Sequence, residues 1–279
     1  MNIDYPLSDV TIREVPEARR LTKRGYADSF RQVNNSEFAM QVASAGNFYA
    51  RDGNYVEFTP APDADREWIR LYLNGQVLVA LLHQRRMLNF HASSFIHNGR
   101  GIMIMGETGA GKSSLTASFI LDGAGFLSDD LTPVVFRNSK PYIKPLSRTI
   151  RLRDNTVSRL NIGDRKLTEA EKGTGKQYLH VERAGVEDYL LSTVLKIEIG
   201  NKAVPEFLTP EPMERFSLLR SEICSWEILA GMPETETDYL QQLLHIVQHA
   251  DIVRVVRPAD IEVAALHAAV RNYLAVEKG

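Results

Sequence analysis

The chain contains the run Gly106-Glu107-Thr108-Gly109-Ala110-Gly111-Lys112-Ser113, which fits the phosphate-binding pattern G-x-x-x-x-G-K-[ST]. Small residues at positions 106, 109 and 111 allow successive backbone N–H groups to point at phosphate oxygens. In this pattern Lys112 reaches the β- and γ-phosphates, Ser113 offers its hydroxyl to Mg²⁺, and Ser114 follows at the start of a helix. The run therefore predicts a P-loop that binds a nucleoside triphosphate.

The residues on either side stand in the order that a P-loop requires. Residues 102–105 form a continuous apolar run typical of a buried strand, and residues 114–121 carry apolar side chains at helical spacing. The positive end of that helix dipole would face the same phosphates. A chance match in a glycine-containing loop is the alternative, and this context disfavours it.

The composition limits the classes of partner. The chain has 279 residues, a formal net charge of −2 and 24% charged residues, without a lysine-rich block that would indicate nucleic-acid binding. Cys224 is the only cysteine, which excludes an internal disulfide and suits a small apolar filler better than a reactive thiol. Neither a secretory signal nor an apolar stretch long enough to cross a membrane is visible. We expect a cytoplasmic protein with no nucleic-acid or membrane partner.

The pattern of apolar residues predicts an α/β chain in two parts. Short alternating stretches within residues 1–60 indicate a small β-rich lobe, and helical spacing over 63–86 predicts a helix or a broken helix pair. The expected division is therefore a lobe with a connecting helix at 1–85 and a P-loop domain at 86–279. Asn98-Gly99 between two apolar runs predicts a hairpin, which makes the P-loop strand antiparallel to its predecessor.

The elements expected after the P-loop alternate between extended and helical segments. Residues 161–178 are polar and contain glycine, which favours a mobile loop. The other expectations are strands at 126–128, 190–199 and 252–256, extended segments at 132–136 and 142–152, and helices at 211–230, 235–250 and 259–276.

Two adjacent carboxylates, Asp129 and Asp130, follow the strand at 126–128 and would lie beside the phosphates. They repel a triphosphate unless a cation lies between them, so charge balance requires Mg²⁺. A turn or helix cap is the structural alternative for this pair. His91 taken alone is better explained by a satisfied structural histidine than by a site residue. His245 and His249 could share a metal at spacing i, i+4, but no third ligand is evident and a solvated or packed helix face is favoured.

With His91, Lys112, Asp129 and Asp130 together, the chain resembles the catalytic domain of HPr kinase/phosphorylase. His91 precedes Gly106 by 106 − 91 = 15 positions, and Asp130 follows Lys112 by 130 − 112 = 18 positions, both as in that family. Residues 72–76, the run 91–93, the N-terminal lobe and the length resemble more specifically the branch associated with lasso-peptide gene clusters, some of whose members phosphorylate a serine at the precursor's C-terminus. The detailed match covers about residues 70–136.

The resemblance implies an HPr-kinase/PEP-carboxykinase-like P-loop domain with a mixed sheet. It implies that Asp130 is the general base for a substrate hydroxyl and that His91 orients and tunes the aspartates. Asp129 would complete the Mg²⁺ environment together with Ser113, and Lys112 would offset charge on the transferred phosphoryl group. The resemblance leaves a homo-oligomer open, because members of the family often form rings.

Departures from the family pattern matter. The family's metal-binding glutamate has no clear counterpart in residues 144–153, where Arg148, Arg151 and Arg153 would instead clamp phosphates or an acidic substrate, or lie on an exposed edge strand. Arg257-Pro258 matches the family's dephosphorylation loop, but residues 259–261 do not, so we expect kinase activity without efficient phosphorylase activity. Arg215 is a weak candidate for the family's other catalytic arginine.

The leading hypothesis is an ATP- and Mg²⁺-dependent kinase that phosphorylates a serine-type hydroxyl of a peptide or protein, such as a lasso-peptide precursor. A small-molecule hydroxyl kinase and a nucleotide-dependent switch that hydrolyses ATP slowly are the alternatives. Residues 201–204 fail the guanine-reading N-K-x-D pattern, and no transporter-type ATPase signature occurs.

Overall fold

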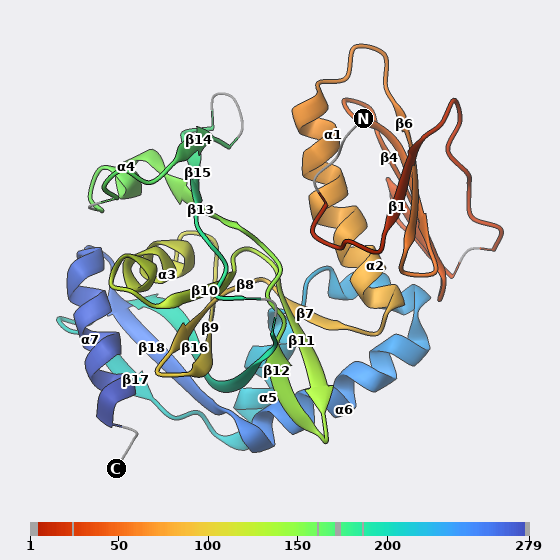
Figure 1. The fold of residues 1–279 in the computed structure, drawn as a ribbon. Coiled ribbons are helices and arrows are strands. Elements are labelled where there is room, and N and C mark those ends of the chain that lie inside the picture. Colours follow the sequence, from red (N-terminus) through yellow and green to blue (C-terminus); the bar gives the residue numbers. More distant parts are fainter. Residues whose placement is uncertain (1–4, 24, 161, 171–173, 186, 277–279) are drawn as a thin grey trace. The chain divides into compact units, whose positions relative to one another are not determined.

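The computed structural model describes residues 5–23, 25–160, 162–170, 174–185 and 187–276 (Figure 1). The chain divides into two compact units, Met1–Asn89 with Ile223–Gln242 and Phe90–Glu222 with Leu243–Gly279. The expected boundary between residues 85 and 86 lies close to Asn89, after which the chain first passes into the second unit. The return of Ile223–Gln242 to the first unit was not expected, because an apolar period indicates that a segment packs but not against which partner.

The first unit contains a six-stranded sheet in the order β1-β6-β5-β4-β3-β2. The strands β2 to β6 pair antiparallel, whereas β1 pairs parallel with β6. The β-rich lobe expected over residues 1–60 is thus present as one sheet. Its strands are β1 (Thr11–Glu14), β2 (Tyr26–Ala27), β3 (Arg31–Val33), β4 (Glu37–Val42), β5 (Gly46–Arg51) and β6 (Tyr55–Pro60).

The helical segment after this sheet runs through a π-helical insertion. The side chain of Asp65 caps α1 (Arg66–Tyr72) by accepting a hydrogen bond from the backbone N–H of Glu67, and η1 (Leu73–Val77) then leads into α2 (Leu78–Gln84). Gly75 lies in η1, so the broken helix pair predicted from the sequence is a helix with a widened turn.

The single helix predicted over residues 211–230 is wrong. The helix α5 (Pro212–Ser221) belongs to the second unit and ends before Ser225, which adopts a left-handed φ of 48°. A 3₁₀ helix, η2 (Trp226–Gly231), follows in the first unit, and α6 (Pro233–His249) leads from there into the second. A left-handed residue cannot continue an α-helix, and that conformation has no clear signal in a serine.

The second unit is built on a mixed sheet in which β10-β8-β9-β16-β12-β11 are successive neighbours. The strands β8 and β9 form the predicted antiparallel hairpin, with φ of 50° at Asn98 and 76° at Gly99. The P-loop strand β9 pairs parallel with β16, which pairs parallel with β18. The chain enters this unit through β7 (Leu88–Phe90), and the other strands are β8 (Ala92–His97), β9 (Arg100–Gly106), β10 (Gly125–Ser128), β11 (Thr132–Arg137), β12 (Lys140–Ile143), β16 (Tyr189–Gly200), β17 (Glu206–Leu208) and β18 (Asp251–Pro258).

Two helices, α3 (Lys112–Leu121) and α7 (Val263–Val276), contact each other and help to form the core of this unit (Figure 1). That core includes Leu115 and Phe119 from α3, Leu266 and Val270 from α7, and the apolar side chains of β9, β16 and β18. The P-loop therefore joins a buried strand to a buried helix, which holds both of its ends in place.

A small antiparallel sheet adjoins this core in the order β13-β15-β14. Its strands are β13 (Thr149–Arg153), β14 (Leu167–Glu169) and β15 (Lys176–His180), and the four-residue helix α4 (Asp154–Val157) follows β13. Part of the loop expected over residues 161–178 is thus strand, because Leu179 is buried in the same core cluster as Ile150 and Leu152. Residues 161 and 171–173 lie outside the described part of the chain.

Candidate nucleotide-binding site

The P-loop follows β9 and ends where α3 begins. A Cβ at Gly106 would lie 2.5 Å from the backbone oxygen of Ile197 on β16, so a larger residue would push the loop away from the sheet. Gly111 precedes α3 with a φ of 106°, and no side chain of the described residues caps the first N–H groups of this helix. These N–H groups, at the positive end of the helix dipole, are the donors that a phosphate requires.

Arg257 on β18 fixes the opposite side of the loop. Its guanidinium donates from Nε to the oxygen of Ala110 at 2.9 Å and from Nη2 to that of Gly109 at 3.4 Å. It also donates from Nη1 to the backbone oxygens of Pro258 and Ala259. The side chain is buried, and burial lowers the pKa of Arg257. Because Arg257 binds the loop carbonyls, it stabilises the loop conformation in which the N–H groups serve as donors.

Replacing Arg257 with alanine is expected to weaken Mg·ATP binding by roughly tenfold to a hundredfold, the range for losing hydrogen bonds to a charged group. Lysine should not restore the affinity, because an ammonium group lacks the planar fork of a guanidinium. Calorimetric titration measures the change. The matched control is Arg254→Ala on the same strand, whose ion pairs are with Glu198 and Glu214. Wild-type affinity in a folded Arg257→Ala protein would contradict this role.

Lys112 and Ser113 begin α3 and face the carboxylates. Lys112 is only 6% exposed, and its Nζ donates to the backbone oxygen of Gly106 at 2.7 Å. Burial lowers the pKa of Lys112, while the negative charges of Glu222, Asp130 and Asp129 act in the opposite direction. The hydroxyl of Ser113 donates to Oδ1 of Asp129 at 2.9 Å. The structure thus places Ser113 of the P-loop in contact with Asp129 of the aspartate pair.

Asp129 is a buried carboxylate with several donors. Ser93 and Ser113 donate to its Oδ1, and the backbone N–H of Arg151 donates to its Oδ2 at 2.9 Å. Its own backbone N–H donates to Oγ of Ser147 at 3.0 Å. Burial, together with the adjacent charge of Asp130, raises the pKa of Asp129 from 3.8 to about 6. A cation bound at Asp129 would offset the electrostatic cost of ionising this buried carboxylate.

The distance between Ser113 and Asp129 fits a magnesium ion. Neighbouring ligands of octahedral Mg²⁺, each 2.0–2.1 Å from the metal, are about 2.9 Å apart. The Ser113 Oγ and Asp129 Oδ1 atoms are separated by 2.9 Å. No cluster of three or more His, Cys, Asp or Glu side chains that could hold a metal occurs among the described residues. Mg²⁺ does not need such a cage, because it usually takes one or two carboxylates and completes its shell with phosphates and water.

The raised pKa of Asp129 predicts a pH-dependent stability without magnesium. Between pH of about 4 and about 6 the unfolded chain loses this proton while the folded chain keeps it, so folded stability falls as pH rises, in total by about 3 kcal/mol. Asp129→Asn removes the charge, and its amide can still accept from Arg151 N–H while donating to the two serine hydroxyls. We expect this variant to unfold at a higher temperature than wild type at pH 7.5 in EDTA.

The extra stability of Asp129→Asn relative to wild type should decrease as the pH is lowered towards 4, because wild-type Asp129 then becomes protonated in both the folded and the unfolded chain. Thermal unfolding at a series of pH values measures it, with the exposed Asp260→Asn as the matched control. A wild type that is as stable as Asp129→Asn at pH 7.5 would contradict the proposed electrostatic penalty.

Asp130 lies next to Asp129 in a different environment. Its side chain is 54% exposed, and its backbone adopts a left-handed φ of 66°. One carboxylate oxygen lies 3.6 Å from Nε2 of His91, and the other lies 3.6 Å from Nη1 of Arg151. The interaction with His91, and then the charges of Arg151 and Lys112, lower the pKa of Asp130. The two adjacent carboxylates thus differ, since Asp130 is accessible and stays ionised.

A buried ion pair completes the electrostatics of the site. Lys196 on β16 pairs with Glu222, and both side chains are 9% exposed. The backbone oxygen of Glu222 also accepts from the N–H of His91 at 2.7 Å. Sequence reasoning missed this pair, because the two residues are far apart in the chain. An isolated lysine within the apolar run of β16 is the signal that could have indicated it.

Other histidines and arginines do not join this site. His83 is buried in the first unit, where Nδ1 contacts the hydroxyl of Tyr239 and Nε2 contacts the backbone oxygen of Cys224. Arg215 donates to the backbone oxygen of Pro210 at the start of α5. His245 and His249 lie on α6, where Nδ1 of His249 contacts the backbone oxygen of His245. Of the three arginines in residues 144–153, Arg151 is the one at Asp130.

The fold resembles those of several solved structures. The HPr(Ser) kinase/phosphatase from Coxiella burnetii is similar over 68% of this chain and 99% of that chain, with a TM-score of 0.37 and 13% sequence identity. No protein-family model matches the sequence, and no curated protein matches it significantly. Among the described helices, none is both long and apolar enough to span a membrane. The likeness is a distant one of fold.

Proposed function

We propose that the chain is a kinase that uses ATP and Mg²⁺ to phosphorylate a serine-type hydroxyl of a peptide or protein. The observation that carries the proposal is the position of Asp130. It is an accessible carboxylate between His91 and Arg151, and its neighbour Asp129 accepts a hydrogen bond from Ser113 of the P-loop. An accessible carboxylate beside the P-loop can accept the proton of an acceptor hydroxyl. The motif spacing, which resembles that of a serine kinase family, supports the choice of acceptor.

In this proposal the P-loop N–H groups and Lys112 bind the phosphates. Asp130 accepts the hydrogen bond of the acceptor hydroxyl and takes its proton as the oxygen bonds to the γ-phosphorus and the bond to the β-phosphate oxygen breaks, which leaves ADP. The lowered pKa of Asp130 keeps it ionised at neutral pH. A carboxylate with a low pKa can serve as this base, as the catalytic-loop aspartate of protein kinases does.

The other side chains of the site would hold Mg²⁺, orient Asp130 or stabilise the leaving group. Ser113 and Asp129 would hold Mg²⁺, which supplies positive charge at the phosphates when it is bound. His91 and Arg151 contact the two oxygens of Asp130 and fix the orientation of its carboxylate. Lys112, buried beside the loop, meets the charge that develops on the leaving β-phosphate.

The test is transfer of label from γ-labelled ATP in an extract of the source organism with Mg²⁺. Wild type, a Lys112→Ala/Asp130→Asn variant and the exposed control Lys140→Ala are compared, and polypeptides, metabolites and free phosphate are separated. Label on a polypeptide serine with wild type and Lys140→Ala, but not with the double variant, supports the proposal. Label in a metabolite instead would indicate a small-molecule kinase, and free phosphate alone would indicate a switch; either result contradicts the proposed acceptor.

A further inference from the structure

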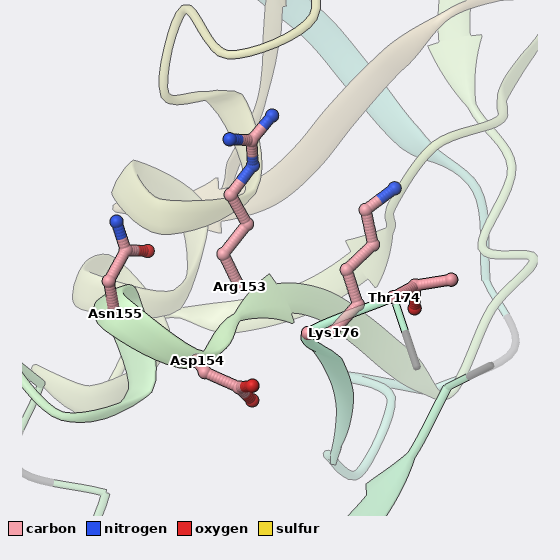
Figure 2. Close-up of a pocket in the computed structure, with 6 residues that line it drawn as sticks. Arg153, Asp154, Asn155, Thr174 and Lys176 are labelled. Carbon is pink, nitrogen blue, oxygen red and sulfur yellow. The ribbon is translucent and has the colours of Figure 1, made fainter. Parts of the chain in front are cut away.

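A cavity of about 420 Å³ lies on the small sheet of the second unit (Figure 2). It is formed by the end of β13, the start of α4 and the residues that lead into β15. The lining residues are Arg153, Asp154, Asn155, Thr174, Gly175 and Lys176. None of them belongs to the nucleotide site described above.

Two positive side chains dominate this cavity. Arg153 and Lys176 stand directly opposite each other in the register of β13 and β15, and both extend to the same side in Figure 2. Neither forms an ion pair with any residue that the structure describes. The carboxylate of Asp154 points away from them in Figure 2 and accepts from Nε2 of Gln177 at 2.7 Å. Directly opposed like charges destabilise a sheet, so an anion bound between them would relieve their repulsion.

The strand β13 connects this pair to the proposed base. Successive side chains of a strand point to opposite faces, and Ile150 and Leu152 are buried in the core, which places Arg151 and Arg153 on the other face. Same-face neighbours on a strand are about 7 Å apart. Since Nη1 of Arg151 lies 3.6 Å from Asp130, a row of positive charge runs from Asp130 to the cavity.

We propose that Arg153 and Lys176 bind an acidic side chain of the peptide acceptor, about two to four residues from the phosphorylated hydroxyl. The spacing follows from the row on β13, because an extended peptide advances about 3.3 Å per residue. The inference rests on the proposed kinase function. A peptide is favoured over the nucleotide because the row begins at Asp130, which faces the acceptor, whereas the loop has its own donors for the phosphates. The acceptor class is therefore an acidic peptide or protein segment.

The test uses nonapeptides with one central serine, a single aspartate at each other position in turn, and asparagine counterparts. Phosphorylation with γ-labelled ATP is measured for wild type, for Arg153→Gln/Lys176→Gln, and for a control with the same charge change at exposed positions, Arg159→Gln/Lys140→Gln. We expect wild type and the control to prefer an aspartate two to four positions from the serine by about tenfold in kcat/KM. The Arg153→Gln/Lys176→Gln protein should lose this preference.

A second readout separates the inference from the proposed function. Binding of each fluorescent peptide, with the serine replaced by alanine, is measured by anisotropy, and Mg·ATP affinity is measured on the same proteins. Aspartate-dependent binding that Arg153→Gln/Lys176→Gln abolishes supports the inference even if another hydroxyl is phosphorylated. Peptides that are labelled with no acidic preference, or with one that persists in this variant, overturn the inference and leave the kinase proposal intact. A loss of ATP affinity in place of peptide discrimination also overturns it, because the pair would then serve the nucleotide.

Discussion

Replacing Asp130 with asparagine is expected to slow phosphoryl transfer by about 10²–10⁴-fold, the usual contribution of a general base. The amide retains the shape of the carboxylate but cannot take the proton of the acceptor hydroxyl. Mg·ATP affinity should change by no more than about threefold, because Asp129, Ser113 and the P-loop donors remain in place. Single-turnover transfer to a peptide and calorimetric titration of Mg·ATP measure the two effects separately.

Asp122 provides the matched control for this substitution. Its side chain is 50% exposed, and its carboxylate lies 3.6 Å from Nε2 of His267 and 3.2 Å from Nη1 of Arg271, which is close to the environment of Asp130. Asp122→Asn therefore removes a similar carboxylate with similar partners and should leave transfer unchanged. If Asp130→Asn retained more than about a tenth of wild-type transfer, Asp130 would not be the base.

The local parts of this site could be predicted from the sequence because their signals are local. The P-loop pattern spans eight residues, and its strand and helix lie directly beside it. The hairpin before it follows from Asn98-Gly99, since both residues tolerate a positive φ. The confirmed features are therefore those in which neighbouring residues determine the backbone conformation.

The contacts made across the fold could not be predicted in the same way. Ser93 and the backbone N–H of Arg151 both bind Asp129, although they lie 36 and 22 positions away in the chain. Arg257 contacts Ala110 across 147 positions. Each of these contacts depends on which strands become neighbours, and an apolar pattern identifies a strand without identifying its neighbour. The sequence therefore indicates which residues carry the proposed chemistry, and the structure adds the contacts that hold them in position.

The small sheet illustrates why one expectation failed. Residues 161–178 are polar and contain glycine, a composition typical of a loop. Nevertheless β14 and β15 form, because β13 offers an unpaired edge and Leu179 joins the buried side chains of Ile150 and Leu152. Pairing across the sheet outweighs a weak local propensity. The same pairing places Lys176 opposite Arg153, which the linear sequence does not indicate.

Lys112→Ala is expected to lower phosphoryl transfer by about 10²–10³-fold, as the loss of a charge aimed at the transition state usually does. The side chain is 6% exposed, and its Nζ donates to Gly106 O at 2.7 Å. A water that filled the space left by alanine would not supply the positive charge. Lys196 cannot substitute, because it is paired with Glu222. Transfer is measured in a single turnover with saturating Mg·ATP, so that weaker nucleotide binding does not mask the chemical step.

Lys112→Arg separates charge from geometry in this prediction. A guanidinium retains the positive charge but is larger and planar, and the buried space beside Gly106 and Glu107 holds a compact ammonium group. We therefore expect Lys112→Arg to recover little of the lost transfer, while the exposed control Lys140→Arg behaves as wild type. Recovery to within about threefold of wild type would show that charge alone is needed at this position, and near-normal transfer by Lys112→Ala would refute the role of Lys112 altogether.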